Sequence, residues 1–338
     1  MYYCGLDLGK KSSQFCIMNA ERKIINEGQV CNKLEHLTKR FGQLSSMRIV
    51  VEASTKTFWI ADRLEELGHE VIVVDPNRTK AIGSGGIKHD KLDARVLAEL
   101  CAVDLLARVT RPKEKERMER MVMVSRDALV RSRTRLVMSV RSLLDSEGID
   151  IKSCATDAFV DVVSDIFDEI PEVMWKAIEP TLTSIHVLTE EISDCDRRIR
   201  ETMDKKEEVR RLKTIPGVGT IVASCYIMAI QDTSRFKSGR EVGAYLGLVP
   251  SLYQSGKTYR QGRITKHGNK QARWLLCIAA NALLRTKRRS RLKEWGETLV
   301  GRLGRKKAIV AIARKLSSVM WAMLKTGTDF ESRLAEAK

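Results

Sequence analysis

The sequence predicts an α/β domain with a mixed sheet at the amino terminus, then a helical middle region, then a mainly helical carboxyl-terminal third. Short runs of β-branched residues alternate with amphipathic helical segments over about the first hundred residues. Apolar residues then recur at heptad spacing, and the last third combines apolar helical faces with many Lys and Arg. We expect domains over residues 1–108, 109–205 and 206–338.

The first domain begins with three consecutive strands and continues with alternating helices and strands. Turns rich in Gly, Lys, Asp and Pro separate these segments. Three strands in series, followed by helices that alternate with strands, are typical of an α/β fold with a mixed sheet. The expected strands are Tyr2–Leu8, Ser13–Met18, Lys23–Val30, Arg48–Val51 and Glu70–Val74, and the expected helices are Lys33–Phe41, Thr57–Leu67 and Asp90–Val103.

Two long helices are expected in the middle domain. The first spans about 112–147, and its apolar residues recur every seven positions at Val122, Leu129, Leu136 and Leu143. The second follows an acidic linker and keeps 3-4 spacing from Ile185 to Ile199. The pattern favours an antiparallel helical hairpin or coiled coil that could join copies of the chain, although an ordinary helical core has the same spacing.

Positive charge is concentrated at the carboxyl-terminal end. The chain carries a formal net charge of +17, and residues 206–338 alone contain 28 Lys and Arg against 9 Asp and Glu. Such an imbalance favours a polyanionic partner, with nucleic acid ahead of an anionic membrane, and a solvated charged face is the plain alternative. Arg126 and Arg133, on the basic face of the first long helix, join the candidate nucleic-acid contacts.

Several classes of protein are disfavoured. The longest apolar stretch, Leu275–Leu284, is interrupted by Asn281 and falls short of the ~20 apolar residues that cross a bilayer. The first residues are strand-like and show no signal-peptide pattern. The eight cysteines form no CxxC pair, so we expect reduced thiols in a cytoplasmic protein and no zinc site or disulfide framework.

Four carboxylates are the strongest chemical signal. Asp7 lies within an apolar strand, and Glu52 lies at the end of the apolar strand Ile49-Val50-Val51. Asp90 and Asp93 begin a helix and are three residues apart. Strands ~4.8 Å apart let acids at their ends converge, and four oxygen donors suit Mg²⁺ or Mn²⁺ better than zinc. Two such ions activate phosphodiester chemistry in many nucleases. The alternatives are a helix cap for Asp90, a first-turn acid for Asp93 and, for Asp75, a turn residue rather than a fifth ligand.

Two segments of the last domain are candidate phosphate-binding sites. Ile215-Pro216-Gly217-Val218-Gly219 resembles a helix-hairpin-helix turn, in which Gly217 and Gly219 would bring backbone N–H groups to a phosphate, although many plain turns match it. A loop expected over Ser251–Lys270 places Ser255 beside cations that would stabilise an oxyanion. A phosphate-binding or merely flexible loop fits these residues as well. The cations are Lys257, Arg260, Arg263, Lys266 and Lys270.

The order of these motifs resembles a known family. Asp7, Glu52 and Asp90-Lys91-Leu92-Asp93-Ala94-Arg95 resemble the RuvC-like, RNase H-type domain of the insertion-sequence 110 transposases, a family that includes Piv-type DNA invertases. Its second transposase domain is similar to the carboxyl-terminal run of this chain. The matching segments are Ile215–Gly219, Gly247-Leu248-Val249-Pro250, Ser255-Gly256 and Gly262-Arg263-Ile264-Thr265-Lys266-His267-Gly268-Asn269.

The resemblance implies more than the spacing does. It implies an RNase H-like fold, a metal set of Asp7, Glu52, Asp90 and Asp93, and a covalent DNA attachment at Ser255. It also implies a homo-oligomer, a dimer or tetramer, with donor and target DNA chosen through an element-encoded guide RNA in the bacterial cytoplasm, at the nucleoid. The family often reads Ser-Ser-Gly-Gly where this chain has Gln254-Ser255-Gly256-Lys257, which leaves Ser251 as the second choice.

The expected function is therefore that of a transposase that cuts and rejoins DNA through a metal-assisted serine nucleophile. Two alternatives stay open at this point. A structure-specific Mg²⁺-dependent endonuclease, similar to a junction resolvase, would use the same acids with water as the nucleophile. A non-catalytic nucleic-acid-binding protein would need the basic residues alone.

Overall fold

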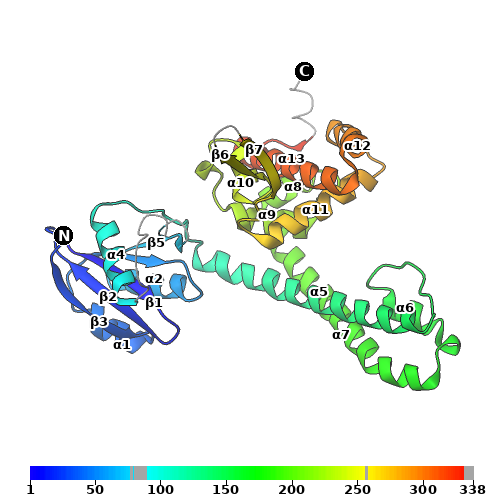
Figure 1. The fold of residues 1–338 in the computed structure, drawn as a ribbon, viewed down its shortest axis with the longest axis horizontal. Helices are drawn as coiled ribbons and strands as arrows, with labels where there is room; N and C mark the ends of the chain where they lie inside the picture. The colour runs from blue at the N-terminus through cyan, green and yellow to red at the C-terminus, as the bar shows by residue number, and fades with distance from the viewer. Residues whose placement is uncertain (77–78, 80–89, 256–257, 331–338) are drawn as a thin grey trace. The chain divides into compact units, whose positions relative to one another are not determined.

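The computed structural model describes residues 1–76, 79, 90–255 and 258–330, and the side chains of residues 90–91, 255 and 258–259 are outside that description. The chain divides into two compact units, Met1–Lys113 and Glu114–Lys338 (Figure 1). The first unit contains a five-stranded sheet with helices, and the second is mainly helical. This confirms the predicted change from an α/β domain to a helical region.

A mixed sheet forms the centre of the first unit. Its strand order is β3-β2-β1-β4-β5. The pairs β1–β2 and β2–β3 are antiparallel, whereas β1–β4 and β4–β5 are parallel, so the sheet is mixed, as the sequence pattern predicts. The strands are β1 (Tyr3–Leu8), β2 (Ser12–Met18), β3 (Ile24–Cys31), β4 (Arg48–Glu52) and β5 (Glu70–Val74).

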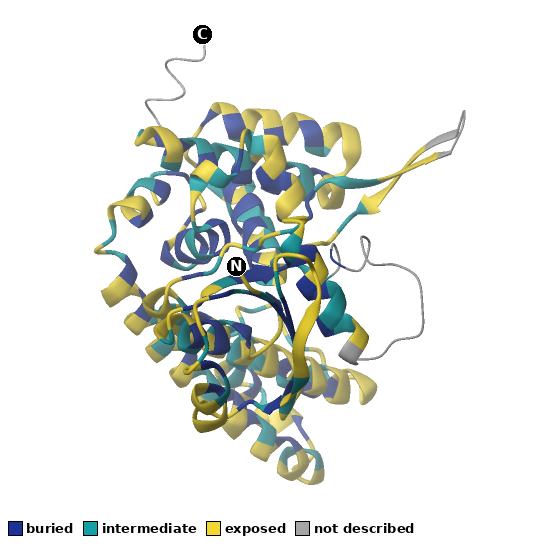
Figure 2. Ribbon diagram, turned by 90° about the vertical axis from the view of Figure 1, so that its left-hand side faces the viewer, coloured by how far each residue is buried: buried dark blue, intermediate teal, exposed yellow. Residues whose placement is uncertain are grey.

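Helices cover both faces of this sheet. On one face, α1 (Leu34–Phe41) and α2 (Thr57–Glu66) pack with Leu6, Ile49 and Val51 in one apolar cluster. On the other face, α4 (Asp90–Ala102) packs on Val50 through Leu97 and Cys101. Figure 2 shows the buried residues gathered on the strands and on the inward sides of the helices. Alternate residues of β1 and β4 therefore face different helices.

The contact between α4 and β1 is unusually close because Gly5 has no side chain. A Cβ atom on Gly5 would lie 2.0 Å from the carbonyl oxygen of Ala94 and 2.5 Å from the backbone nitrogen of Ala98. The thiol of Cys101 donates to the carbonyl of Arg48, at the start of β4 (3.7 Å). The helix therefore runs antiparallel to β1 and β4 and begins beside their carboxyl ends.

The second unit opens with two long antiparallel helices, α5 (Glu114–Ser146) and α7 (Glu172–Met203), joined through α6 (Phe159–Ser164). Lys206, just after α7, binds Glu119 near the start of α5 (2.5 Å), whereas Leu144 near the end of α5 shares an apolar cluster with Ile178 near the start of α7. The start of α5 therefore lies beside the end of α7, and the end of α5 lies beside the start of α7, so the two helices are antiparallel.

A larger helical core follows the hairpin of α5 and α7. Tyr226 lies at its centre, and its hydroxyl donates to the carbonyl of Ser317 (2.5 Å). Burial raises the pKa of Tyr226 well above its usual value, so the residue serves as a neutral hydrogen-bond donor. The helices are α8 (Glu207–Leu212), α9 (Thr220–Ile230), α10 (Gly239–Tyr245), α11 (Lys270–Arg285), α12 (Arg291–Leu303) and α13 (Arg305–Thr326).

One local prediction was wrong. The segment after Val249, expected as a loop, forms an antiparallel ribbon of β6 (Pro250–Ser255) and β7 (Thr258–Ile264). Leu252 and Tyr253 are mostly exposed in it. Because both faces of the ribbon meet solvent, its strands lack the apolar alternation that marks a half-buried strand, and its Gly, Ser and Lys content is that of a loop.

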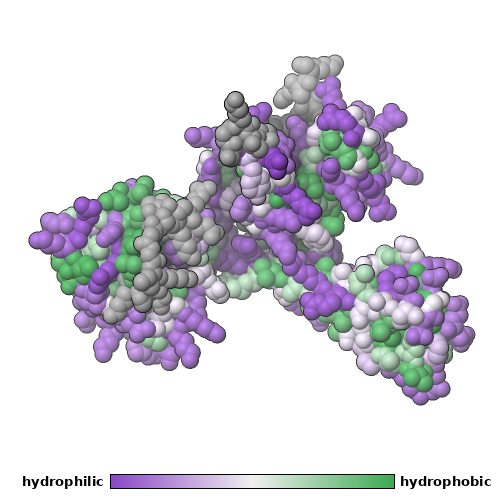
Figure 3. All heavy atoms as spheres, viewed as in Figure 1, coloured by the Kyte–Doolittle hydropathy of each residue, from purple (hydrophilic) through white to green (hydrophobic). Residues whose placement is uncertain are grey.

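Polar side chains and protonated thiols characterise the two units. Figure 3 shows hydrophilic side chains over much of the visible surface. No helix among the described residues is long and apolar enough to cross a membrane. All eight cysteines are free, and burial raises the pKa of Cys16 to about 11 and of Cys101 to about 12, so these thiols are protonated packing residues.

We predict that Gly5→Ala destabilises the first unit. The new methyl group would overlap the backbone of α4, which cannot move as a side chain can, so we expect a loss of about 3 kcal/mol or more in the free energy of unfolding. Hydrogen–deuterium exchange of peptides from β1 and α4 measures this locally. Gly301→Ala is the control, because no described atom lies within 4 Å of its added Cβ and alanine favours the helix. Unchanged protection in Gly5→Ala would contradict the close packing.

Candidate active site and nucleic-acid interface

Asp7 and Glu52 lie on neighbouring parallel strands at the same sheet edge. Leu6 is paired with Val51, so Asp7 and Glu52 are the next residues along β1 and β4. Leu6 and Val51 face α1 and α2, and alternation therefore turns both carboxylates toward the face of α4. Both side chains are half-buried, and each has a polar or electrostatic partner. The predicted convergence of these two acids is thus supported by strand register.

The start of α4 brings two more acids to this edge. Asp90 is the first residue of α4, and Asp93 is half-buried one turn further on. Asp93 neighbours Ala94 and Leu97, the residues that place α4 against the sheet. The side chain of Asp90 is outside the described residues.

The donor set is the kind that holds a hard divalent cation. All four predicted residues supply carboxylate oxygens, with no thiol or imidazole among them, and this favours Mg²⁺ or Mn²⁺ over zinc. The side chains of Asp7, Glu52 and Asp93 are described, and no three His, Cys, Asp or Glu among the described residues are grouped as ligands of one metal ion. Asp75 follows β5, and its carbonyl accepts hydrogen bonds from Thr79, as expected for a turn residue.

An ion pair holds α4 across the sheet. Arg95 donates from Nε and Nη2 to the two carboxylate oxygens of Glu27 on β3, at 2.8 Å each. The bidentate geometry is specific, but the side chains are 42% and 34% exposed, so the pair adds only modestly to the packing that places the helix. Two residues before Arg95 stands Asp93. We infer that this pair helps to position the first turn of α4.

Ser255 and Ser251 occupy opposite ends of β6. Ser251 is at the base, where its hydroxyl donates to the carbonyl of Arg263 on β7 (3.0 Å). Ser255 is the last residue of the strand and is paired with Thr258 across the turn. The side chain of Ser255, like Gly256 and Lys257 as a whole, lies outside the described residues. Ser251 is therefore engaged in the ribbon, whereas Ser255 adjoins its turn.

The motifs at the base of the ribbon pack backbone against backbone. A Cβ on Gly247 would lie 2.3 Å from the carbonyl of His267, and one on Gly268 would lie 2.1 Å from the carbonyl of Tyr245. Lys266 adopts a left-handed φ of 58° and donates its backbone N–H to Gly247 (3.1 Å). This conformation costs a non-glycine residue about 1–2 kcal/mol. The motifs that contain Gly247 and Gly268 thus hold the base of the ribbon against the helical core through backbone contacts.

The N-cap of α11 adds further hydrogen bonds at the base of the ribbon. The side chain of Asn269 accepts from the backbone N–H of Ala272 (3.0 Å) at the start of α11. Arg273 donates to the carbonyls of Leu246 and His267 (2.9 and 2.8 Å). Among the predicted nucleic-acid residues, Arg260, Arg263, Lys266 and Lys270 are exposed around this base and along β7.

The predicted helix-hairpin-helix glycines have different roles. Gly217 has a left-handed φ of 86°, and a Cβ there would lie 2.7 Å from the backbone nitrogen of Leu283 on α11. Gly219 is the N-cap of α9, and no described atom lies within 4 Å of its Cβ position. Asp204 accepts from Thr220 at the start of α9 (2.7 Å) and from Lys213 (2.8 Å). Burial would raise the pKa of Asp204, but these two hydrogen bonds lower it below the usual value.

Arg126 and Arg133 connect the two long helices. Arg126 donates to both carboxylate oxygens of Asp196 on α7, and only 15% of its side chain is exposed. Arg133 donates to the hydroxyl of Thr189 on α7 (3.2 Å), and burial lowers its pKa. These guanidinium groups stabilise the hairpin, which accounts for both residues without a nucleic-acid contact.

The structure adds a basic cavity that no single motif indicated. It has a volume of about 1430 Å³ and lies between α10, β7, α12 and α13. Its cations come from segments far apart in the sequence, so only the excess charge of residues 206–338 could have signalled it. They are Arg240, Arg263, Lys266, Lys306, Lys307, Arg314 and Lys315.

Comparison with known proteins identifies the class. One family model, described as a transposase, matches residues 4–148, and a second, described as Transposase IS116/IS110/IS902 family, matches residues 209–294. Together they match both units of the fold, which defines the chain as a DNA-recombination enzyme of the transposase class. The insertion-sequence 110 resemblance is thereby confirmed.

Full-length relatives support the same assignment. The "Probable family 20 transposase" of Pseudomonas aeruginosa is 30% identical over 96% of this chain and 97% of its own length. The transposase for insertion sequence element IS1111A of Coxiella burnetii is 26% identical over 95% and 88%. The pilin gene-inverting protein of Moraxella bovis is 26% identical over 86% and 84%. This chain belongs to the IS116/IS110/IS902 transposase family.

We predict that Arg126→Ala destabilises the second unit and leaves nucleic-acid affinity unchanged. The substitution strands the largely buried carboxylate of Asp196, and breaking such a pair costs up to about 3 kcal/mol here. Thermal denaturation and a DNA-binding titration measure the two effects. Arg131→Ala, on the same helix but half exposed and paired with Asp127 one turn away, is the matched control. A stable Arg126→Ala variant with weakened DNA binding would reverse the assignment.

Proposed function

We propose that this protein is the transposase of a bacterial insertion sequence and that it cuts and rejoins DNA through a metal-assisted serine nucleophile. One observation carries the proposal. Because α4 packs on Gly5, the start of α4 lies beside the carboxyl ends of β1 and β4, which carry Asp7 and Glu52. The mixed sheet that holds these acids supports an RNase H-like assignment for the first unit.

Asp7, Glu52, Asp90 and Asp93 are the residues that would hold the divalent cation. A cation bound there would draw charge away from the scissile phosphate and favour attack on phosphorus. The chain's own contribution is to fix these oxygens on rigid elements. Two of the acids belong to β1 and β4, and two to the first turn of α4, the helix that packs on Gly5.

Ser255 is the proposed nucleophile. Its Oγ attacks phosphorus as its proton leaves to a base, the bond between phosphorus and one strand oxygen breaks, and that oxygen takes up a proton. One DNA end is then joined to Ser255 through a phosphodiester. Attack by the hydroxyl of another strand end reverses the step, so rejoining needs no external energy source. The exposed Arg260 on β7 and the neighbouring Lys257 would stabilise the charge that develops on phosphorus.

The proposed partners are donor DNA, target DNA and a guide RNA encoded by the element. The excess of 28 basic over 9 acidic residues in 206–338 supports polyanionic partners of both kinds. The guide RNA and the assembly of the chain as a homo-oligomer follow from the family resemblance. We propose that the acids of one copy act with the serine of another.

We predict that Asp7→Asn abolishes strand cleavage with Mg²⁺. The amide keeps the shape of the side chain but removes a charged ligand, so cleavage of DNA from the element's ends falls by roughly 100-fold or more. The matched control is Asp104→Asn, an exposed acid at the opposite end of the first unit that pairs with Arg108. Undiminished Mg²⁺-dependent cleavage by Asp7→Asn would remove this residue from the metal set.

We predict that Ser255→Ala eliminates the covalent protein–DNA adduct and strand transfer. Labelled element-end DNA is incubated with the protein, and the adduct is measured on a denaturing gel. Ser251→Ala is the control and keeps the adduct, because Ser251 hydrogen-bonds within the ribbon. Strand cleavage that persists in Ser255→Ala without any adduct would instead identify a junction-resolvase-like endonuclease that uses water.

A further inference from the structure

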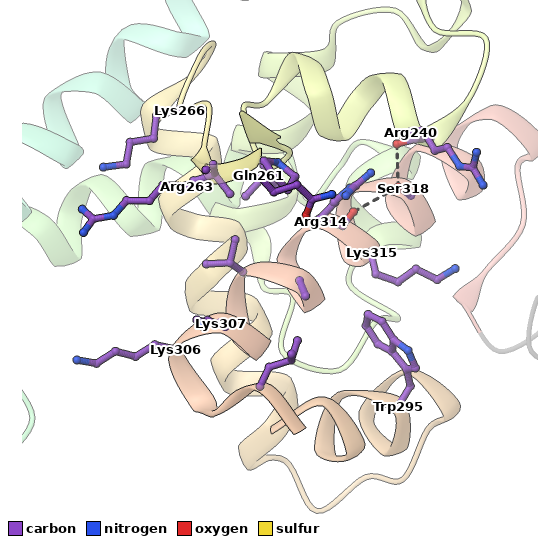
Figure 4. Close-up of a pocket in the computed structure, with 18 of the residues that line it drawn as sticks. Arg240, Gln261, Arg263, Lys266, Trp295, Lys306, Lys307, Arg314, Lys315 and Ser318 are labelled. Atoms are coloured by element: carbon purple, nitrogen blue, oxygen red, sulfur yellow. Dashed lines mark hydrogen bonds between the residues drawn. The ribbon is translucent and has the colours of Figure 1, made fainter. Parts of the chain in front are cut away.

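The basic cavity of the second unit is larger than a small-molecule pocket. Its volume of about 1430 Å³ exceeds the ~300–1,000 Å³ typical of drug-sized ligands. Figure 4 shows Gln261 and Arg263 of the ribbon on one side, Trp295 of α12 across the cavity from them, and Arg314 and Lys315 of α13 between. The walls are formed by well-packed elements.

The cations of this cavity lack neutralising partners. Among the described residues, seven Lys and Arg line it and no Asp or Glu does. In the part of the chain that the structure describes, none of the seven forms an ion pair, whereas Arg126, Arg197 and Arg211 elsewhere in this unit each do. Like charges gathered in one cavity repel one another, and an anionic ligand of matching length removes that cost.

Charge at the start of α13 points to the same conclusion. Its first turn carries Arg305, Lys306 and Lys307 and no acid. The positive end of the helix dipole disfavours cations by about 0.3–1 kcal/mol each and favours anions. Arg305 donates a hydrogen bond to the side-chain oxygen of Asn281 (2.7 Å), whereas Lys306 and Lys307 line the cavity.

Trp295 presents an aromatic surface at the cavity wall. It is 40% exposed, and its indole has no hydrogen-bond, ion-pair or ring partner among the described residues. The next residue, Gly296, lets α12 approach α13 so closely that a Cβ there would lie 2.8 Å from the Ile312 side chain. By contrast, Trp321 is buried and donates to the carbonyl of Thr233 (3.0 Å). Trp295 thus lies on a closely packed helix, with its ring available to a ligand.

We propose that this cavity binds an unpaired strand of DNA, with one base stacked on Trp295 and phosphates contacted by Lys306, Lys307, Arg314 and Lys315. Positively charged grooves that contain an available aromatic ring are the usual means of holding single strands, because every base has a face that stacks. A duplex keeps its bases stacked within itself and offers none to Trp295. The ring and the cations together therefore select an unpaired strand.

The choice of DNA rests on the proposed function. Arg263 and Gln261 of β7 line the cavity, and the other end of the same ribbon carries Ser255. Arg263 lies five positions along β7 from Thr258, the partner of Ser255, which is about 17 Å at ~3.3 Å per residue. A stacked strand covers that length in about five nucleotides at ~3.4 Å each. The strand held in the cavity is then the continuation of the strand cut at Ser255.

The test measures binding of the full-length protein to fluorescein-labelled oligonucleotides of one sequence, as single-stranded DNA, duplex DNA and single-stranded RNA. We expect Trp295→Leu to weaken single-stranded DNA binding by about 5- to 150-fold, which corresponds to ~1–3 kcal/mol of stacking per base. Duplex binding stays unchanged, and Trp295→Tyr restores most of the affinity. Trp274→Leu is the matched control, because Trp274 is 45% exposed in the same unit but does not line the cavity.

A second variant tests the binding of phosphates. Replacing Lys306 and Lys307 by Ala should lower the salt dependence of single-strand binding by roughly 0.7 in the logarithmic slope for each phosphate that is no longer neutralised. Equal weakening of single-strand and duplex binding in Trp295→Leu, or no weakening at all, would overturn the proposal. Tighter binding of RNA than of DNA would overturn the choice of DNA. Failure of the serine mechanism appears separately, as loss of the Ser255 requirement with the Trp295 effect intact.

Discussion

The first unit depends on the direct contact of a helix backbone with a strand backbone at Gly5. Because no side chain separates them, α4 lies deep on β1, and Cys101 at one end and Arg95 near the other add contacts to this packing. The beginning of the helix is thereby placed where β1 and β4 end. Interior packing thus determines which elements lie along this edge, and the carboxylates themselves contribute little to that placement.

Sequence patterns predicted this part of the molecule well, for a physical reason. The strands β1, β2, β4 and β5 are buried on at least one face, so their apolar residues mark their extent in the sequence. Asp7 and Glu52 stood out because an acid inside or at the end of such a run breaks the pattern. The role of Gly5 could not be read in the same way, since a glycine in a strand signals a close approach without naming the element that approaches.

The second unit shows where such patterns fail. The ribbon of β6 and β7 was expected as a loop because two exposed strands have no buried face to produce alternation. Its position is set instead by contacts distant in sequence, in which Gly247 meets His267 and Gly268 meets Tyr245. The motifs that carry the family resemblance here therefore serve largely to pack the backbone at the base of the ribbon against the helical core.

The net charge of a segment is also an incomplete guide to a binding site. The net charge of a segment treats every cation alike, yet Arg126 is neutralised by Asp196 whereas Lys306, Lys307 and Arg314 face a cavity that no described acid lines. A paired guanidinium presents almost no field to a ligand, and an unpaired one in a concave site presents an enhanced field. The excess of positive charge seen in the sequence therefore becomes informative only once the pairs are subtracted. The cations of the cavity then stand out, because they lie beside an available indole and at the base of the ribbon that carries Ser255.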